Sequence, residues 1–406
     1  MVATTKNIAF SACDRAAAIG LPTLQIEQEH VAQQTKSREI SEKTTAIQVE
    51  QLEQFHDKYG AKASLMSTVA DIREEDMGGL RGSDFDVAMD ESFEACAENG
   101  ASILCVETIG GKVVSDYGIS RGDIRAILYG IGLLGSIDME YMWTKISDIA
   151  SKYSYCVPGG DTDCAQANTA MFLAGGLTSK NVSHTLAAVA RAISGARSLV
   201  AVEAGAVGPL KDCGYENPIV KAVAGVPICA EGKNATCAHS DLMGNLACAV
   251  VDCWSNESVY NREEMGGPTT GVWLQSLGYE CALMNTATKI NKAEELRDMY
   301  TLADKYRDPQ ALVLAYDNAY RIGEAIVAEG EDIYLRARAA GLEGISIINE
   351  AVDAKKLYLT RFERDSLDSA QKTIEQLPED KDKFAKACIK RYSRKVKEHD
   401  PSQYEL

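Results

Sequence analysis

The chain lacks an excess of basic residues. Its 42 lysines and arginines stand against 59 aspartates and glutamates, which gives a formal net charge of −17. A surface of that sign repels phosphate groups, so we expect neither a nucleic-acid partner nor binding to an anionic membrane. Long apolar runs are also missing, because the longest, residues 126–137, is too short to span a bilayer.

Two further absences indicate in which compartment the protein is located and which class of binding fold it lacks. The amino-terminal stretch is interrupted by Asp14 and Arg15 before any secretory core forms. Twelve cysteines without a signal peptide therefore indicate a reducing, cytoplasmic location, where cysteines serve as core residues, metal ligands or nucleophiles. A nucleotide fold is not indicated, because the chain has neither a G-x-G-x-x-G nor a Walker pattern.

What the chain does contain is an alternation of helical stretches and short apolar strands. Strands are predicted at 21–27, 63–69, 102–106, 154–157, 199–202, 226–231 and 281–285. Polar residues follow several strand ends, as in a (β/α)8 TIM barrel, although a doubly wound open sheet gives a similar alternation. We predict an α/β fold of the TIM-barrel type at residues 1–330, with additional C-terminal helices at residues 331–406 packed on the barrel.

Three candidate metal ligands decide between these folds. Glu107, Cys164 and Cys213 each follow a predicted strand, 57 and 49 residues apart, and a barrel gathers such loops around one axis. Two thiolates and a carboxylate would form a three-ligand zinc site whose open fourth position is the catalytic pattern. A lone cysteine after a strand is more often a packed core residue, so the spacing by itself leaves the choice open.

The stretch GGDTDCAQAN, residues 159–168, surrounds one of these ligands. Asp163 is the predicted N-cap of a helix at 165–174, which places Cys164 in the first helical turn. The positive end of the helix dipole favours a thiolate there, as a ligand or nucleophile requires.

Other polar residues are candidates for supporting roles. Asp161 and Asp163 could donate a proton or hold a ligand, although turn and N-cap roles explain them equally well. Cys237 and His239 form a C-x-H pair, and a fourth protein ligand from it would close the zinc site. Elsewhere we expect a histidine, His30, on the surface, and core cysteines at positions 96, 105, 156, 248 and 253.

Long, irregular segments carry a family resemblance. They are VETIGGK (106–112), LYGIGLLGSIDMEYMW (128–143), GGDTDCAQANTAMF (159–172), EAGAVGPLKDCGYENPIVKA (203–222) and ATCAHSDLMGN (235–245), with WSNES (254–258) and DKYRDPQ (304–310) in support. In these segments the chain resembles the zinc-dependent methanol:corrinoid methyltransferases. The resemblance implies a TIM barrel whose zinc is held by Glu107, Cys164 and Cys213.

The same resemblance implies a function and a partner. Methanol would give its methyl group to the cobalt(I) of a corrinoid (cobalamin) on a partner protein, with a proton from Asp161, Asp163 or His239, and we expect a hetero-oligomer or a homodimer. The alternatives are a zinc methyltransferase for a thiol or another small methoxy compound, and a docking scaffold with structural zinc. Family members begin with a glycine-rich segment and an early strand ahead of the first helix of this chain, so we expect the bottom of the barrel to differ.

Overall fold

The computed structural model describes residues 1–73, 79–175, 181–211, 214–229, 232–233, 243–250, 268–404 and 406. In chain order its elements are α1 (Val2–Ala18), β1 (Thr23–Glu29), α2 (Ala32–Thr35), α3 (Arg38–Tyr59), β2 (Lys62–Ala70), α4 (Asp84–Glu98), β3 (Ile103–Glu107), α5 (Lys112–Arg121), α6 (Ile124–Ile127), the π-helix η2 (Leu128–Gly135), α7 (Ser136–Ala150), β4 (Val157–Pro158), α8 (Ala167–Ala174), α9 (His184–Glu203), α10 (Asn217–Ala224), α12 (Gly244–Val250), α13 (Pro268–Lys289), α14 (Ala293–Asp304), α15 (Pro309–Leu314), α16 (Tyr316–Ala328), α17 (Ile333–Asp353), α18 (Arg361–Glu375), α19 (Lys381–Tyr392) and the 3-10 helix η3 (Pro401–Tyr404).

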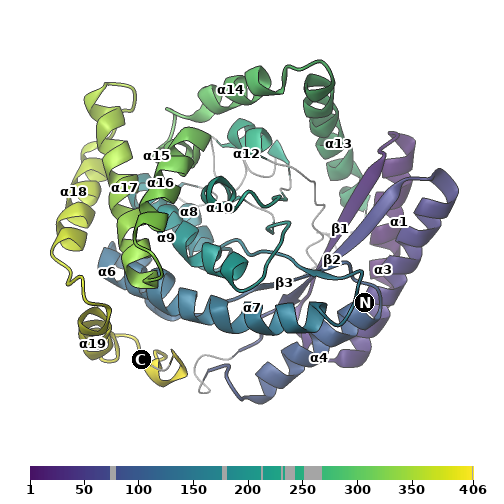
Figure 1. Ribbon diagram of the computed structural model, residues 1–406, viewed down its shortest axis with the longest axis horizontal. Coiled ribbons are helices and arrows are strands. Elements are labelled where there is room, and N and C mark those ends of the chain that lie inside the picture. Colours follow the sequence, from purple (N-terminus) through teal and green to yellow (C-terminus); the bar gives the residue numbers. More distant parts are fainter. Residues whose placement is uncertain are drawn as a thin grey trace.

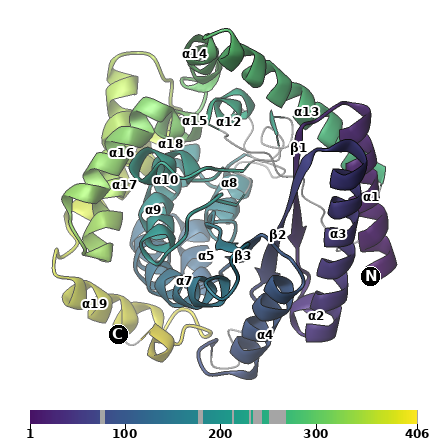
Figure 2. The ribbon, with the colours of Figure 1, turned by 45° about the vertical axis from the view of Figure 1, so that its right-hand side comes forward.

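Four parallel strands form a sheet in the order β1-β2-β3-β4. The middle of β2 and nearly all of β3 are buried, as expected for parallel strands covered on both faces. The predicted strands 63–69 and 102–106 are therefore confirmed. The fold is a helix-rich α/β structure, and its helices surround the sheet (Figures 1 and 2).

The parallel pairing continues beyond β4 through single bridges. Gly160 pairs with Leu210, and Leu210 pairs with Ile228. The residue after this last bridge reaches the first strand, because Gln25 Nε2 on β1 lies 3.0 Å from Cys229 Sγ. The predicted strand at 226–231 is thus a single bridge within its described part, residues 226–229.

Two predicted strands are wrong. Residues 199–202 form the last turn of α9, and residues 281–285 lie within α13. Helix α9 is buried on all sides, so its apolar residues show no helical period. It is long and apolar enough to cross a membrane, but 94% of the relevant window is buried inside the protein.

A π-helix, η2, joins α6 directly to α7. Ser136 therefore does not cap a new helix as its position suggests, and its hydroxyl donates instead to the carbonyl of Gly132 at 2.9 Å. Gly130 in η2 lies against Gly111, where a Cβ on Gly130 would come within 2.8 Å of the Gly111 carbonyl oxygen. This close backbone approach requires glycine.

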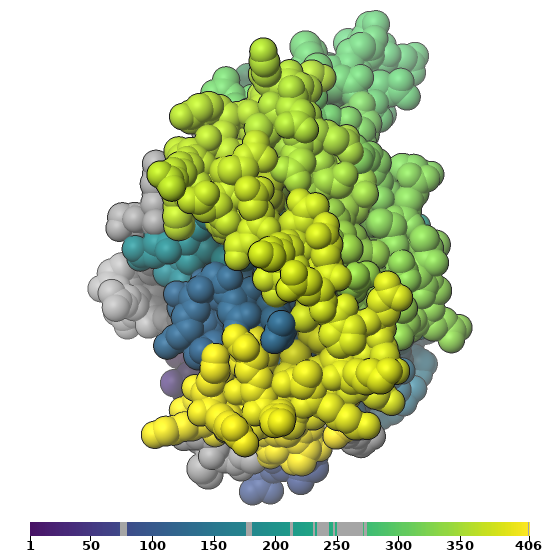
Figure 3. Space-filling model, turned by 90° about the vertical axis from the view of Figure 1, so that its left-hand side faces the viewer, coloured from purple at the N-terminus to yellow at the C-terminus, as the bar shows by residue number. Residues whose placement is uncertain are grey.

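The C-terminal helices share one apolar core with the middle of the chain. Side chains of α17, α18 and α19 belong to the same buried cluster as those of α5, η2 and α9. Aromatic rings join them, since Tyr334 stacks on Phe384 at 4.2 Å between ring centroids. The C-terminal residues cover one face of the molecule and border residues of α5 (Figure 3).

Candidate functional site

Glu107, the last residue of β3, is held by a buried lysine. The Nζ atom of Lys211 lies 2.6 Å from Glu107 Oε1, and it also lies 3.5 Å from Glu27 and 3.6 Å from Glu29. The Lys211 side chain is fully buried, so its charge requires such partners. Three carboxyl groups thus meet around one ammonium group at this end of the sheet.

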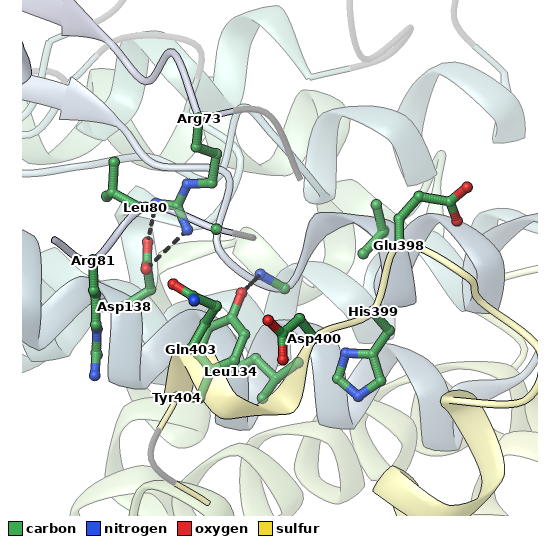
Figure 4. A pocket seen from close by; sticks show the side chains of 13 residues that line it. Arg73, Leu80, Arg81, Leu134, Asp138, Glu398, His399, Asp400, Gln403 and Tyr404 are labelled. Atoms are coloured by element: carbon green, nitrogen blue, oxygen red, sulfur yellow. Dashed lines mark hydrogen bonds and ion pairs between the residues drawn. The ribbon is translucent and has the colours of Figure 1, made fainter. Parts of the chain in front are cut away.

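Directly after Glu107, the loop 108–111 is fixed by what we call the Arg73 cluster: Arg73, Asp71, Asp138 and Thr108. The guanidinium of Arg73 lies 2.6 Å from Asp71. It also lies 2.7 Å from Asp138, an ion pair that Figure 4 shows. The Thr108 hydroxyl donates to Asp138, and the N–H of Ile109 donates to Asp71 at 3.1 Å.

The charge state of this cluster is settled by its arginine. Burial raises the pKa of Asp138, but the charge and hydrogen bonds of Arg73 outweigh it, so the pKa lies below its usual value. Asp138 therefore stays ionised, and the Arg73 cluster is an anchor for the loop.

The remainder of the loop is held by two distant segments. Gln166 Nε2 donates to the carbonyl of Gly110 at 2.7 Å, which joins this loop to the turn that carries Cys164. The N–H of Gly111 donates to the hydroxyl of Tyr404 at 2.8 Å, near the C-terminus.

Cys164 was predicted to lie in the first turn of a helix, but it lies in a turn that precedes α8. Asp163 makes the expected contact, because its Oδ1 accepts the N–H of Gln166 at 3.0 Å, but residues 164–166 form a turn and α8 begins at Ala167. The Cys164 side chain is half-buried and packs with Tyr215 in a small apolar cluster.

Behind this turn lies a second group of buried charges, the Arg197 cluster: Arg197, Asp161, Asp163 and Glu216. All four side chains are fully buried. Arg197 lies 2.9 Å from Asp161, Glu216 accepts the N–H of Asp163 at 2.9 Å, and Asp163 accepts the Ser194 hydroxyl at 2.5 Å. Three carboxyl groups thus share one cation.

This imbalance affects the protonation of the Arg197 cluster. Burial raises the pKa of Asp161 well above its usual value, and nearby carboxylates add to the effect while Arg197 opposes it. Burial likewise raises the pKa of Glu216 to about 7. Within the part of the chain that the structure describes, Asp161 Oδ1 is buried without a hydrogen-bond partner. The cluster can therefore hold a proton near neutral pH.

The third predicted ligand, Cys213, lies outside the described residues. The residues that flank the pair 212–213 are described. Lys211 contacts Glu107, and Tyr215 belongs to the small apolar cluster against which Cys164 packs. The residue before the pair 212–213 thus contacts one predicted ligand, and a residue shortly after it shares an apolar cluster with the other.

The predicted proton donor His239 and its neighbour Cys237 also lie outside the described residues. Among the residues that the structure does describe, no three cysteine, histidine, aspartate or glutamate side chains form a metal-binding group. Lys211, Arg197 and Glu216 were not among the predicted site residues. The signal for Arg197 was a charge within a mostly apolar segment, since a charge that is buried must be paired.

Of the remaining predictions, the one for His30 was wrong and those for four cysteines are confirmed. His30 is buried rather than exposed, because it packs beneath α4 with Ser92 Oγ 3.3 Å from its Nδ1, and burial lowers its pKa to about 3. Core positions are confirmed for cysteines 96, 105, 156 and 248, while Cys253 lies outside the described residues.

Comparison with known proteins extends these observations. The sequence profile of the methanol-cobalamin methyltransferase B subunit family matches residues 1–405. The chain is 52% identical, over 400 residues, to the methanol–corrinoid protein co-methyltransferase of Methanosarcina barkeri, and the alignment covers 98% of this chain and 86% of that protein. The fold is similar to the crystal structure of the methanol:cobalamin methyltransferase complex MtaBC from Methanosarcina barkeri, with a TM-score of 0.94, 50% identity, and coverage of 100% of this chain and 88% of the other.

Proposed function

The chain belongs to the methanol-cobalamin methyltransferase B subunit family, and from this premise we propose the reaction and the roles of its residues. The enzyme transfers the methyl group of methanol to the cobalt of a corrinoid carried by a partner protein, and it acts in the cytoplasm. The observation that supports this most is the near-complete match to a methanol–corrinoid protein co-methyltransferase, which includes the segments around Glu107 and Cys164.

We propose that the sheet closes into a TIM barrel. The side-chain contact between Gln25 on β1 and Cys229 supports closure. So does a buried cluster in which Cys229 joins Met66, Ile103 and Cys105 from β2 and β3, as interior side chains of a barrel would. On this proposal residues 1–330 form the barrel and residues 331–406 form the helical layer packed on it.

We further propose a zinc ion held by Glu107, Cys164 and Cys213. The carrying observation is that Lys211, before Cys213, contacts Glu107, and that Tyr215, after it, belongs to the cluster against which Cys164 packs. The excess of carboxylates around Lys211 adds a favourable field for a cation. When bound, zinc with an open position would polarise the oxygen of methanol as a Lewis acid.

The residues of the chain supply the rest of the chemistry. Hydroxide is a poor leaving group, so the oxygen needs a proton as the C–O bond breaks. Asp161 is our first candidate donor, because its pKa is raised and its Oδ1 accepts no hydrogen bond from the described residues. Asp163 is better suited to positioning, since both its oxygens accept hydrogen bonds. His239 stays a candidate from the sequence.

The test combines metal analysis with turnover. We expect about one zinc per chain in the purified protein and methanol-dependent loss of the cob(I)alamin absorbance. Cys213→Ala and Cys164→Ala should each lose both zinc and activity, whereas Cys156→Ala, at a buried cysteine away from these loops, should keep both. Full turnover by a zinc-free variant would overturn the metal site, and zinc binding without methanol-dependent methylation would overturn the reaction.

A further inference from the structure

The segment after α19 returns to the loop that follows Glu107. We call residues 398–404 the C-terminal strap. His399 Nε2 lies 3.3 Å from the hydroxyl of Tyr129, and the two rings meet edge-on at 5.5 Å between centroids. At the end of the strap, the hydroxyl of Tyr404 accepts the N–H of Gly111 (Figure 4).

The backbone of the loop is packed so closely at Gly110 and Gly111 that neither position has space for a side chain. Gly111 has φ +77°, and a Cβ there would overlap the carbonyl oxygen of Gly130. A Cβ on Gly110 would overlap the Asp138 side chain. The loop is therefore pressed between η2 and α7 on one side and the strap on the other.

The strap also closes tightly over this part of the molecule. The cavity between the strap and the Arg73 cluster has a volume of about 30 Å³. Its lining includes Leu134, Asp138 and His399, so the strap and the supports of the loop face the same small cavity. Gly111 itself is buried, and its N–H depends on the acceptor that Tyr404 provides.

We propose that Tyr404 is a positioning residue for Glu107. By holding the N–H of Gly111 it fixes the far end of the loop 108–111, while the Arg73 cluster fixes the near end, and the direction of the Glu107 carboxylate follows from both. The inference rests on the proposed zinc site. It assigns a role in the site to a residue 293 positions after Gly111 in the chain.

The test is Tyr404→Phe, which keeps the ring and removes the acceptor. Zinc loss to a chelator should become roughly 10-fold faster and kcat roughly 10-fold lower, the lower end of the effect of removing a group that supports a metal ligand. KM for methanol should change less than about 2-fold, because no contact with substrate is removed. Amide exchange in the peptide 107–112 should rise.

The matched control is Ser402→Ala on the same strap, since the Ser402 hydroxyl bonds only to Asp400 within the described residues. It should leave zinc loss, kcat and loop exchange at wild-type values. Unchanged zinc loss in Tyr404→Phe, with or without faster loop exchange, would overturn the positioning role. A wild-type protein that binds no zinc would overturn the metal proposal and this inference with it, and faster loop exchange in Tyr404→Phe would then show that the strap contact alone is real.

Discussion

The Arg73 cluster and the Arg197 cluster each surround one buried arginine that contacts Thr108, and they differ in how their charges are balanced. In the Arg73 cluster one cation meets two carboxylates, and none of its described side-chain atoms is buried without a hydrogen-bond partner. In the Arg197 cluster one cation meets three carboxyl groups, and Asp161 Oδ1 and Arg197 Nε lack such partners among the described residues.

The difference shows in the direction of the pKa shifts. Arg73 holds the pKa of Asp138 below its usual value, whereas burial and mutual repulsion raise the pKa values of Asp161 and Glu216. In the Arg73 cluster the carboxylates are hydrogen-bonded to the arginine, and such a network stabilises one geometry of the loop. A buried group that is under-compensated keeps a proton, which a catalyst can use.

The largest expected effect is a loss of methyl-transfer activity on a substitution in the Arg197 cluster. Asp161→Asn keeps the shape of the side chain but cannot donate an acidic proton, so methyl transfer should fall by roughly 100-fold or more, within the range of general acids. The free energy of unfolding should change by less than about 1 kcal/mol, because the raised pKa of Asp161 favours its neutral form, which the amide resembles. Cob(I)alamin methylation kinetics and urea denaturation measure the two quantities. Full turnover in this variant would remove Asp161 from the mechanism.

The same exchange in the other cluster should have the opposite outcome. Asp138→Asn removes the carboxylate that joins Arg73 to Thr108 and leaves Arg73 with Asp71 alone, so it should lower the free energy of unfolding by about 1–3 kcal/mol. Urea denaturation measures this loss, and Asp161→Asn is its matched control. A loss below about 1 kcal/mol would show that the Arg73 cluster is not the anchor described above.

A third prediction uses pH. Burial raises the pKa of Glu216 from 4.5 to about 7, so the folded state binds an extra proton between these values. Its contribution to stability is full below pH 4.5 and is lost as the pH rises toward 7, by at most about 3 kcal/mol. Asp161, whose pKa is also raised, adds to the same fall. In Glu216→Gln the fall should therefore become smaller by the part that Glu216 contributes, which unfolding measurements from pH 4.5 to 8 can check. An equal fall in the variant would place the titration elsewhere.

The smallest effect tests how the Arg73 cluster grips the loop. Thr108→Val removes the hydroxyl that donates to Asp138 and should lower the free energy of unfolding by about 1 kcal/mol. Thr108→Ser keeps the hydroxyl and should recover most of the loss in a thermal unfolding experiment. If both variants lose the same amount, the methyl group rather than the hydrogen bond matters.

The sequence predicted the elements whose local chemistry is unambiguous. Helix α10 (Asn217–Ala224) has Pro218 in its first turn and is followed by Gly225 in the left-handed conformation, a pattern that marks both ends of a helix in the sequence. The strands β2 and β3 were found because they are short apolar runs bounded by polar residues. The last turn of α9 was mistaken for a strand because burial on every side removes the helical period.

Much of the site could be anticipated, but its buried charges could not be paired in advance. Glu107 stands out as the first charge after a buried strand, and Asp161 lies in a conspicuous glycine-rich turn. The pairing of Lys211 with Glu107 and that of Arg197 with Asp161 join residues 104 and 36 positions apart. Such pairs depend on how distant segments meet, which no local pattern reports.

The π-helix η2 has a consequence for how this protein can change over evolutionary time. Its eight residues connect α6 and α7 without a break, and α7 carries Asp138 to Arg73. One residue added or removed here would rotate everything beyond it by about 100° about the helix axis. Asp138 would then face away from the loop that follows Glu107. Insertions and deletions in residues 128–135 are therefore excluded, and substitutions there are limited too, because all eight residues are buried and Gly130 must stay glycine.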